Sequence, residues 1–285
     1  MRRAAISLTC AIGALVLVTA CAGEARDVPR APAPPAVTAW AIGDAEPGGD
    51  ARLLAARVRG ERPDRFLYLG DVYETGTARE FRAGYEPLFG ALGARTIPTP
   101  GNHEWGKRAV GYLPYWRGKL GRPAGDWSRH RVGRGWEVLS LNSEAPHGAG
   151  SAQLRWLAAA TAQPGTCRIA LWHRPRWSTG WHGDQDDMAP VWDALRGRAR
   201  LVLSGHDHDL QRFADRDGLR QYVSGGGGRP NIPLPRGSRA RPVFVNRLST
   251  GGLRLSLTRG RAAMTFVSAS GRVLDRSTAT CRPTG

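Results

Sequence analysis

The sequence predicts an α/β fold whose C-terminal part consists of strands alone. Apolar, strand-like runs alternate with segments of helical spacing from Val37 to His208, which is typical of βα units. After His208 only short strands and turns follow. We therefore expect an α/β sheet stack with a second, mostly antiparallel sheet packed against it. At 285 residues, 41% of them hydrophobic, the chain is long enough to bury one large core or two small ones.

The strands of the alternating part are short apolar runs, most of which end at a glycine. We expect them at residues 37–43, 65–70, 95–101, 136–142, 168–172 and 200–205. Helices are expected between them at 51–60, 77–92, 151–162 and 188–198, and Thr77 and Glu80 have the spacing of a capping box. Residues 106–135, rich in Trp, Gly and Arg, are expected to be irregular. The tail should add strands at 219–228, 242–248, 253–260, 262–269 and 272–277.

The first 21 residues are typical of a signal peptide. A basic start, an apolar run and small residues lead to Cys21, as in a bacterial lipobox, where the cysteine is lipidated and becomes the new N-terminus. The alternative is an ordinary secretory signal cleaved near Ala22. In both cases the mature protein lies outside the cytosol, and we expect a lipid-anchored protein of the cell envelope. Residues 22–36, rich in Ala and Pro, predict a tether, and residues 37–285 predict the folded domain.

Two of the four cysteines belong to the folded domain. Cys10 lies in the apolar part of the signal and Cys21 in the lipobox, which leaves Cys167 and Cys281. In an oxidising compartment we expect these two to form a disulfide that fastens the C-terminal segment to the strand near Cys167. The alternative is a pair of buried free thiols. The sequence has no CxxC or cysteine-rich zinc pattern.

The chain is strongly basic, with a formal net charge of +17. Such a charge suggests a nucleic-acid partner first. However, only Lys107 and Lys119 are lysines, and the arginines are scattered instead of forming a basic run. Abundant Arg, Ala, Gly and Pro are what a GC-rich genome produces. We therefore expect no specific nucleic-acid partner, and attraction to anionic envelope polymers or phosphorylated substrates remains open.

Polar residues follow five of the predicted strands at the point where each strand ends. They are Asp44, Asp71, the Asn102–His103 pair, His173, and the His206–Asp207–His208 segment. In α/β sheets the loops at this edge converge, and ligands bind there. Carboxylates, an amide oxygen and imidazoles together suit a pair of divalent or trivalent metal ions. One such cluster would indicate no more than a turn, but five in this context predict a site.

These motifs, written "GD…GD…GNHE…H…GHDH", resemble the calcineurin-like metallophosphoesterase superfamily, in particular the branch similar to purple acid phosphatases. The resemblance runs from about Val37 to about Gly228. It implies a four-layer αββα sandwich of two mixed sheets flanked by helices, with a two-metal site. It also implies that the stretch at 224–230, "SGGGGRP", is a strand-to-loop turn near this site and not a phosphate-binding loop.

The resemblance assigns a role to each of these residues. Asp44, Asp71 and His208 would hold the first metal ion. Asp71 would bridge to the second ion, which Asn102, His173 and His206 would complete. His103 would face the substrate phosphate, and His182 occupies the position of a second histidine on the substrate side. Trp105, Trp177 and Trp181 are further candidates to line the pocket.

The first metal position departs from the family pattern. Purple acid phosphatases carry an iron-binding tyrosine four residues after the glycine of the second motif, where this chain has Glu74. Tyr73 lies one position earlier, and a shorter loop would let it reach the metal. The third residue of the first motif is Glu46, where other branches have histidine. Iron, manganese and zinc therefore all remain open as the metals.

The resemblance predicts metal-dependent hydrolysis of a phosphorylated small molecule. A phosphatase acting on monoesters is the first hypothesis, with in-line attack by an activated hydroxide. A phosphodiesterase acting on nucleotides or lipid headgroups is the second, and a non-catalytic binding lipoprotein is a third, from a different class. The binding protein would be expected to have lost a ligand, whereas all six are present. The natural substrate and the oligomeric state are left open.

Overall fold

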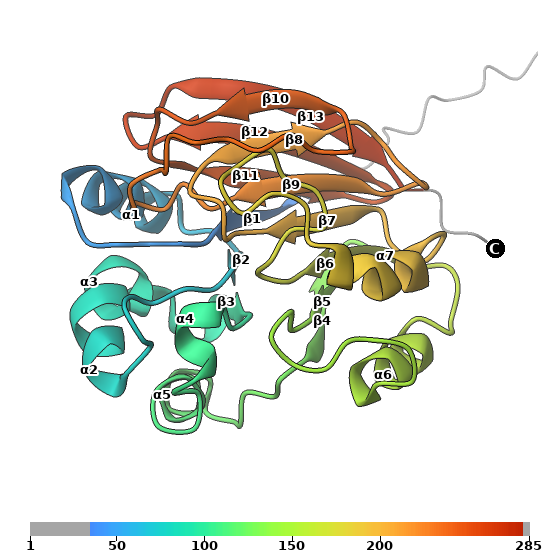
Figure 1. Ribbon diagram of the computed structural model, residues 1–285, viewed down its shortest axis with the longest axis horizontal. Coiled ribbons are helices and arrows are strands. Elements are labelled where there is room, and N and C mark those ends of the chain that lie inside the picture. The colour runs from blue at the N-terminus through green and yellow to red at the C-terminus, as the bar shows by residue number, and fades with distance from the viewer. Residues whose placement is uncertain (1–34, 282–285) are drawn as a thin grey trace, which may run out of the picture. The chain divides into compact units, whose positions relative to one another are not determined.

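The computed structural model describes residues 35–281, which form two mixed β-sheets flanked by helices (Figure 1). The predicted signal peptide, Cys21 and the tether up to residue 34 lie outside the described residues. Within residues 35–281, no helix is both long enough and apolar enough to cross a lipid bilayer. The expectation of two mixed sheets with helices is confirmed.

The first sheet has the strand order β13-β12-β11-β1-β2-β3. Its parallel part consists of β1 (Val37–Ile42), β2 (Arg65–Tyr68) and β3 (Thr96–Pro98). Three antiparallel strands extend it beside β1: β11 (Gly251–Thr258), β12 (Arg261–Ser268) and β13 (Val273–Thr280). Helix α1 (Gly49–Glu61) connects β1 to β2.

The second sheet has the order β10-β8-β9-β7-β6-β5-β4. Its parallel strands are β5 (Trp136–Ser140), β6 (Cys167–Leu171), β7 (Leu201–Ser204) and β9 (Arg220–Ser224). The antiparallel strands are β4 (Ser128–Gly133), β8 (Leu210–Phe213) and β10 (Pro242–Asn246). Helices α6 (Ala152–Ala160) and α7 (Ala189–Leu195) connect β5 to β6 and β6 to β7.

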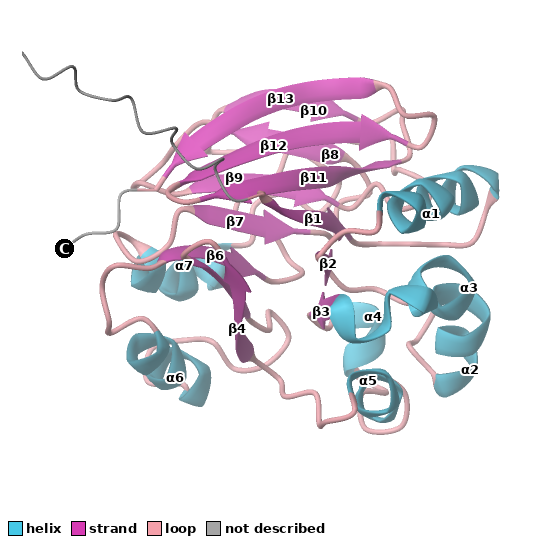
Figure 2. Ribbon diagram, turned by 180° about the vertical axis from the view of Figure 1, so that it is seen from behind, coloured by secondary structure: helices cyan, strands magenta, loops and turns pink. Residues whose placement is uncertain are grey.

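The expectation of a separate antiparallel sheet is wrong. The strands after His208 are divided between the two sheets: β8, β9 and β10 join the second sheet, while β11, β12 and β13 join the first (Figure 2). Each sheet therefore has a parallel part, built from βα units, and antiparallel strands at its edge. The pattern of short strands identified the tail as β structure but carried no information on which sheet each strand pairs with.

Two of the local predictions have clear outcomes. The capping box is confirmed, because the Glu80 amide donates to Thr77 Oγ1 (3.3 Å) and the Thr77 amide donates to the Glu80 carboxylate (2.8 Å) at the start of α2 (Ala78–Glu80). Helical turns continue from there through α3 (Glu86–Phe89) to residue 95. The expectation that residues 106–135 are irregular is wrong in part, since α5 (Tyr112–Leu120) and β4 lie within them.

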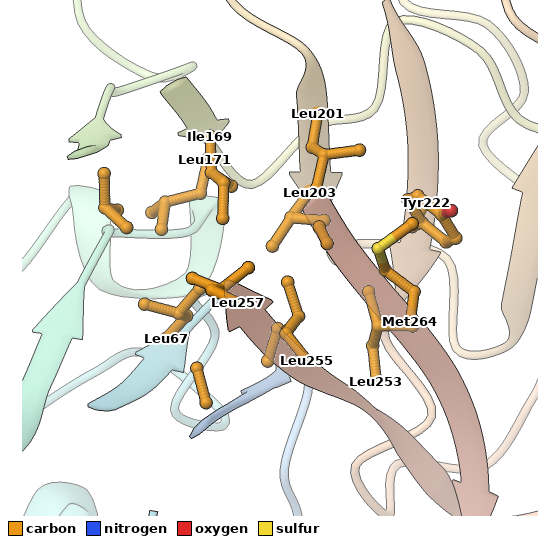
Figure 3. Packing of buried hydrophobic residues seen from close by; sticks show 14 of the residues in the cluster. Leu67, Ile169, Leu171, Leu201, Leu203, Tyr222, Leu253, Leu255, Leu257 and Met264 are labelled. Carbon is orange, nitrogen blue, oxygen red and sulfur yellow. The ribbon is translucent and has the colours of Figure 1, made fainter. Parts of the chain in front are cut away.

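Three apolar clusters separate the layers of this fold. One fills the space between the sheets, where side chains of β6 and β7 point toward those of β2 and β11 (Figure 3). A second lies between the first sheet and α1, α3 and α5, and the third lies between the second sheet and α6 and α7. Burial of each such leucine contributes about 1.5–3 kcal/mol. The two sheets are thus a rigid support for the loops at their edges.

Cys167 and Cys281 form a disulfide with a Cα–Cα distance of 5.8 Å. Cys167 begins β6 in the second sheet, and Cys281 follows β13 in the first. The bond therefore joins the two sheets covalently at the amino-terminal end of β6. It leaves the opposite end of β6, which precedes His173, free for the site.

Candidate metal centre

Loops that follow five parallel strands meet at one edge of the two sheets. These loops follow β1, β2, β3, β6 and β7, and they carry the predicted residues Asp44, Asp71, Asn102, His103, His173, His206 and His208. The sheets are joined here by backbone hydrogen bonds, such as that from the Gly43 amide to the Ser224 carbonyl (2.9 Å). Residues that are up to 164 positions apart in the sequence (44 and 208) are thereby brought into one cluster.

Three of these residues have left-handed backbone conformations. The φ angles are 59° for Asp44, 68° for Asp71 and 72° for His206. Such conformations are rare outside glycine, cost on the order of 1–3 kcal/mol, and cluster at functional sites. Here they are held by side-chain bonds, since the His206 amide donates to Asp44 Oδ2 (2.8 Å) and the His103 amide donates to Asp71 Oδ1 (3.1 Å).

The glycines that precede these residues provide the space for them. A Cβ atom at Gly70, where φ is +95°, would lie 2.8 Å from His173 Nδ1. A Cβ atom at Gly205 would lie 2.5 Å from Asp44 Oδ2. Both distances are shorter than real Cβ contacts, so a side chain at either position would displace the candidate ligands. The "GD" and "GH" patterns therefore have a steric cause.

The first group of candidate ligands surrounds His173. Its Nε2 atom lies 3.1 Å from His206 Nδ1, 3.0 Å from Asn102 Oδ1 and 3.3 Å from Asp71 Oδ2. Ligand atoms about 2.1 Å from one ion and at angles of about 90–110° are separated by roughly 3.0–3.4 Å. Asp71, His173 and His206 are buried, and their ligand atoms all lie within 4.8 Å of one another. This group therefore has the spacing that a single metal ion requires.

The second group consists of Asp44, His208 and Tyr73. The Tyr73 hydroxyl donates a hydrogen bond to Asp44 Oδ1 (3.0 Å) and lies 3.1 Å from His208 Nε2, while Asp44 Oδ1 and His208 Nε2 are 3.8 Å apart. The tyrosine that the sequence places one position early thus reaches the residues expected to hold the first metal. Glu74, which takes the expected position of the tyrosine, is exposed instead.

Replacing Tyr73 with phenylalanine should lower metal affinity at this group. Loss of a partner that contacts ligand atoms typically costs about 10–100-fold in metal affinity. We expect the dissociation constant for metal at this group to rise by about that factor. It would be measured by equilibrium dialysis over a range of free metal concentrations, with elemental analysis of the bound metal. Tyr115→Phe is the matched control, because the Tyr115 hydroxyl donates to Glu86 (2.5 Å) on α3, away from the site. Equal affinity in the Tyr73 variant and the wild type would contradict a role for this hydroxyl.

Backbone carbonyls fix the orientation of two histidines. His173 Nδ1–H donates to the Leu69 carbonyl (2.8 Å), and His208 Nδ1–H donates to the Pro230 carbonyl (2.7 Å). The lone pair of each ring is then on Nε2, which faces the other candidate ligands. Metal-binding histidines are commonly held by such outer bonds. In the neutral rings, each of these lone pairs points toward other candidate ligand atoms, an arrangement that fits a cation between them.

The charges of the site also fit metal ions. Burial raises the pKa of Asp44 well above its usual value. Burial lowers the pKa of His173, but the charges of Asp71 and Asp44 outweigh this effect and raise it to about 10. Although burial raises the pKa of Asp71, its pairing with His173 lowers it to about 2. The carboxylates thus favour positive charge at this point, which a metal ion supplies more strongly than a proton does.

Glu104 holds the loops that carry Asp71 and Asn102, a role that the sequence pattern does not indicate. Its buried carboxylate accepts hydrogen bonds from the Asp71 amide (3.0 Å) and the Gly101 amide (3.0 Å). It belongs to α4 (Asn102–Trp105), the short helix that begins with Asn102. Glu104 is part of the "GNHE" motif, but its role depends on Asp71, which lies 33 residues away on another loop.

His103 and His182 lie on the open side of the two groups. His103 Nδ1–H donates to the Glu74 carbonyl (2.5 Å), and its Nε2 atom lies 3.8 Å from Asp71 Oδ2. The His182 ring stacks on the His206 ring with 3.8 Å between centroids. Both side chains are partly exposed, so they face the solvent side of the candidate ligands.

A cavity of about 160 Å³ lies over the site. Among the described residues it is lined by Asp71, Tyr73, Asn102, His103, His182, His206, His208, Arg229 and Ile232. The expectation that Trp105, Trp177 and Trp181 line it is not met. Trp177 instead packs in the cluster under α7, and the Arg176 guanidinium lies 3.7 Å from its ring centroid.

Arg229 connects the glycine-rich stretch to this cavity. Its amide donates to the Asp44 carbonyl (3.1 Å), and its guanidinium lies 4.4 Å from the Tyr73 ring centroid. The same guanidinium pairs with Glu74 (2.6 Å) and Glu46 (3.2 Å). The two positions that depart from the family pattern are therefore joined by one arginine at the rim of the cavity.

Comparisons with known proteins show the family and agree with the fold. The sequence model of the calcineurin-like phosphoesterase family matches residues 37–210. GAP50, the anchor in the inner membrane complex of Plasmodium, has a TM-score of 0.70 at 14% identity, over 87% of this chain and 90% of that chain. For the purple acid phosphatase PPD1 from yellow lupin (Lupinus luteus) seeds the TM-score is 0.68 at 16% identity. That alignment covers 86% of this chain but only 54% of the lupin enzyme, so the chain spans about half its length.

A dimetal phosphatase from Danio rerio has a TM-score of 0.62 at 14% identity, over 87% of this chain and 100% of that chain. A search of curated proteins gave no significant match. At these identities the structural likeness shows the fold alone. The family assignment rests on the match of the family's sequence model to residues 37–210.

Proposed function

The chain belongs to the calcineurin-like phosphoesterase family, and on this basis we propose that it hydrolyses phosphate monoesters with a pair of metal ions. The observation that carries the proposal is the convergence of seven ligand-type side chains from both sheets, with two further histidines on their open side. Asp44, Tyr73 and His208 would hold one ion. Asn102, His173 and His206 would hold the other, and Asp71 would be shared.

Two such ions, when bound, supply the Lewis acidity that makes water a nucleophile near neutral pH and neutralises phosphoryl oxygens. The protein contributes position and proton donors. His103 is tied to the Glu74 carbonyl through Nδ1, so in the doubly protonated ring its Nε2–H group would donate to a phosphoryl oxygen at the cavity. Such preorganised donors stabilise the charge that develops during phosphoryl transfer.

The size of the cavity supports a monoester as substrate. Its volume is about 160 Å³, well above the roughly 10–15 Å³ that one water molecule needs on the same measure. A terminal phosphoryl group fits such a space, with the organic part of the ester outside the rim. We rank a diester second because its additional ester arm would have to be accommodated beside Arg229, which lines the cavity and is already paired with Glu46 and Glu74. A phosphodiesterase is therefore the second hypothesis.

A binding protein without catalysis is the alternative from another class. The similar fold of GAP50, described as an anchor, gives this alternative a structural precedent. The complete ligand set and the buried charges of the present site favour catalysis, because a binding role alone would not require them.

We further propose that the chain functions outside the cytosol, held to the cell envelope by a lipid on Cys21. The disulfide between Cys167 and Cys281 supports an oxidising compartment, since such bonds are rare in the cytosol. Mass spectrometry of the protein from membranes would test this: a diacylglyceryl group on Cys21 is expected, and an unmodified mature N-terminus at Ala22 would contradict it.

Metal removal and addition test the proposed activity. A chain from Ala22 onward would be stripped by a chelator and assayed with p-nitrophenyl phosphate and bis-p-nitrophenyl phosphate while manganese, zinc or iron is added. We expect no hydrolysis without metal, its return with metal, and faster turnover of the monoester. Faster turnover of the diester would favour the phosphodiesterase. No turnover of either substrate with any metal would favour the binding protein.

A further inference from the structure

A second cavity, of about 170 Å³, adjoins the cavity over the candidate metal centre. His208 and Arg229 line both cavities. The walls of the second cavity come from the glycine-rich loop after β9 and from residues 247–250, which connect β10 to β11. Its volume is far above the roughly 10–15 Å³ that one water molecule needs. It therefore has room for a group of several atoms beside the candidate metal ligands.

The backbone of both walls is held in place by hydrogen bonds. The Gly251 amide donates to the Gly226 carbonyl (2.8 Å), which joins the start of β11 to the glycine-rich loop. The Ser249 amide donates to Asn246 Oδ1 (2.9 Å), which fixes the turn between β10 and β11. The second cavity thus lies between two loops that are bonded to each other and to the ends of their strands.

Three polar side chains of this lining have groups left for a ligand. Within residues 35–281, the hydroxyls of Ser249 and Thr250 and the amide oxygen of Asn231 form no hydrogen bond to another protein group. The Asn231 Nδ2–H group donates to the Arg247 carbonyl (3.4 Å). Since a hydroxyl can both donate and accept and an amide oxygen accepts, these groups match a ligand that carries several hydroxyls.

Aromatic and hydrocarbon ligands match this lining less well. Among the described residues, no phenylalanine, tyrosine or tryptophan lines the second cavity, so a nucleobase would have no such ring to stack on. The apolar side chains of the lining are Pro230 and Leu248, and Leu248 is 97% exposed. A hydrocarbon chain would therefore bury little apolar surface there.

Both arginines of the lining already have acidic partners. Arg229 pairs with Glu46 and Glu74, and Arg247 Nε lies 3.6 Å from Asp209 Oδ2. A second anionic group on a substrate would have to compete with these carboxylates. The lining therefore favours an uncharged, hydroxylated group over a second phosphate or a carboxylate.

From these observations we propose that the second cavity binds the organic part of the substrate, and that this part is an uncharged, hydroxylated group such as a sugar or glycerol. The inference rests on the proposed phosphatase function and adds the substrate class, which the metal centre does not specify. With the phosphoryl group at the metal centre, the organic part would extend past Arg229 into the second cavity. Ser249 and Thr250 are then specificity-determining residues, which bind the leaving group and take no part in breaking its bond to phosphorus.

Two matched pairs of substrates test the role of the hydroxyl groups. Glucose 6-phosphate and cyclohexylmethyl phosphate share the ring size and the methylene ester linkage, but only the first carries hydroxyls. Glycerol 1-phosphate and propyl phosphate differ in the same way. With the metal-loaded protein we expect kcat/KM to be at least about 10-fold higher for the hydroxylated member of at least one pair, since each hydrogen bond adds roughly 2–10-fold.

Removing two hydroxyls from the protein should remove this preference. For the Ser249→Ala/Thr250→Val double variant we expect KM for the preferred hydroxylated phosphate to rise about 10-fold, with kcat and metal content unchanged and KM for the hydroxyl-free phosphates within about 2-fold. Ser256→Ala/Thr265→Val is the matched control. It makes the same changes at half-buried residues of β11 and β12 that line neither cavity, and it should alter neither class of substrate.

Equal kcat/KM within both pairs of substrates would overturn the inference, as would a higher kcat/KM for AMP than for either hydroxylated phosphate. An equal rise in KM for all substrates in the Ser249 and Thr250 variant would also overturn it. A wild-type protein that hydrolyses none of these phosphates, and not p-nitrophenyl phosphate either, with any metal would instead overturn the proposed function. The two failures are distinguishable because p-nitrophenyl phosphate tests the metal chemistry with a leaving group that has no sugar or glycerol hydroxyls.

Discussion

Replacing His206 with alanine is expected to lower phosphate ester hydrolysis by at least about 10³-fold, because the chemistry depends on both metal ions. The His206 Nδ1 atom lies 3.1 Å from His173 Nε2, and the side chain is buried. Its removal leaves the second metal position with one imidazole fewer. We also expect bound metal to fall from two ions per chain to about one. Elemental analysis and steady-state kinetics on the same sample measure both effects.

His130→Ala is the control for this variant. His130 bonds Ser128 at the start of β4 (2.8 Å), within the second sheet and outside the cavity lining. It should keep full activity and metal content. Full activity and full metal content in the His206 variant would show that the assignment of the site is wrong.

Replacing Cys167 and Cys281 together with serine is expected to lower the free energy of unfolding by about 3–5 kcal/mol. The two cysteines are 114 positions apart, so the bond restricts a large loop of the unfolded chain. The corresponding fall in melting temperature is roughly 10 °C for a domain of this size. Thermal unfolding followed by circular dichroism measures it.

The same variant should keep its activity at temperatures where it is folded. The disulfide lies at the amino-terminal end of β6, and His173 follows the other end, roughly 20 Å along the extended chain. Wild-type protein treated with reductant is the control, and it should melt at the temperature of the double variant. An unchanged melting temperature in both would contradict a stabilising role for the bond.

The alternation of strands and helices allowed the sequence to predict most of this fold. Apolar runs that end in glycine marked the parallel strands, and a "GD" or "GH" after such a run marked the loops of the site. The tail was predicted as strands, but its division between two sheets depends on pairing partners far away in the sequence, such as β1 with β11. Strand β8, directly after His208, was missed because its four residues are shorter than a clear alternating pattern.

The residues of the candidate site also differ in how well the sequence alone identifies them. Residues whose own type indicates metal chemistry, such as His173 and Asn102, were identified from the sequence. Residues whose role depends on a distant partner were not, and Glu104 is the example. Tyr73 lies between these cases, because the resemblance suggested it and its spacing argued against it. Only the folded loop places its hydroxyl beside Asp44 and His208.

Anomalous X-ray diffraction from crystals of the manganese-loaded chain is the most direct test of the proposed pair of metal ions, which would share Asp71 at the edge of the two sheets. We predict two anomalous peaks, one between Asp44 and His208 and the other between His173 and His206, with Asp71 in contact with both. A single peak, no peak, or peaks at other residues would contradict the claim.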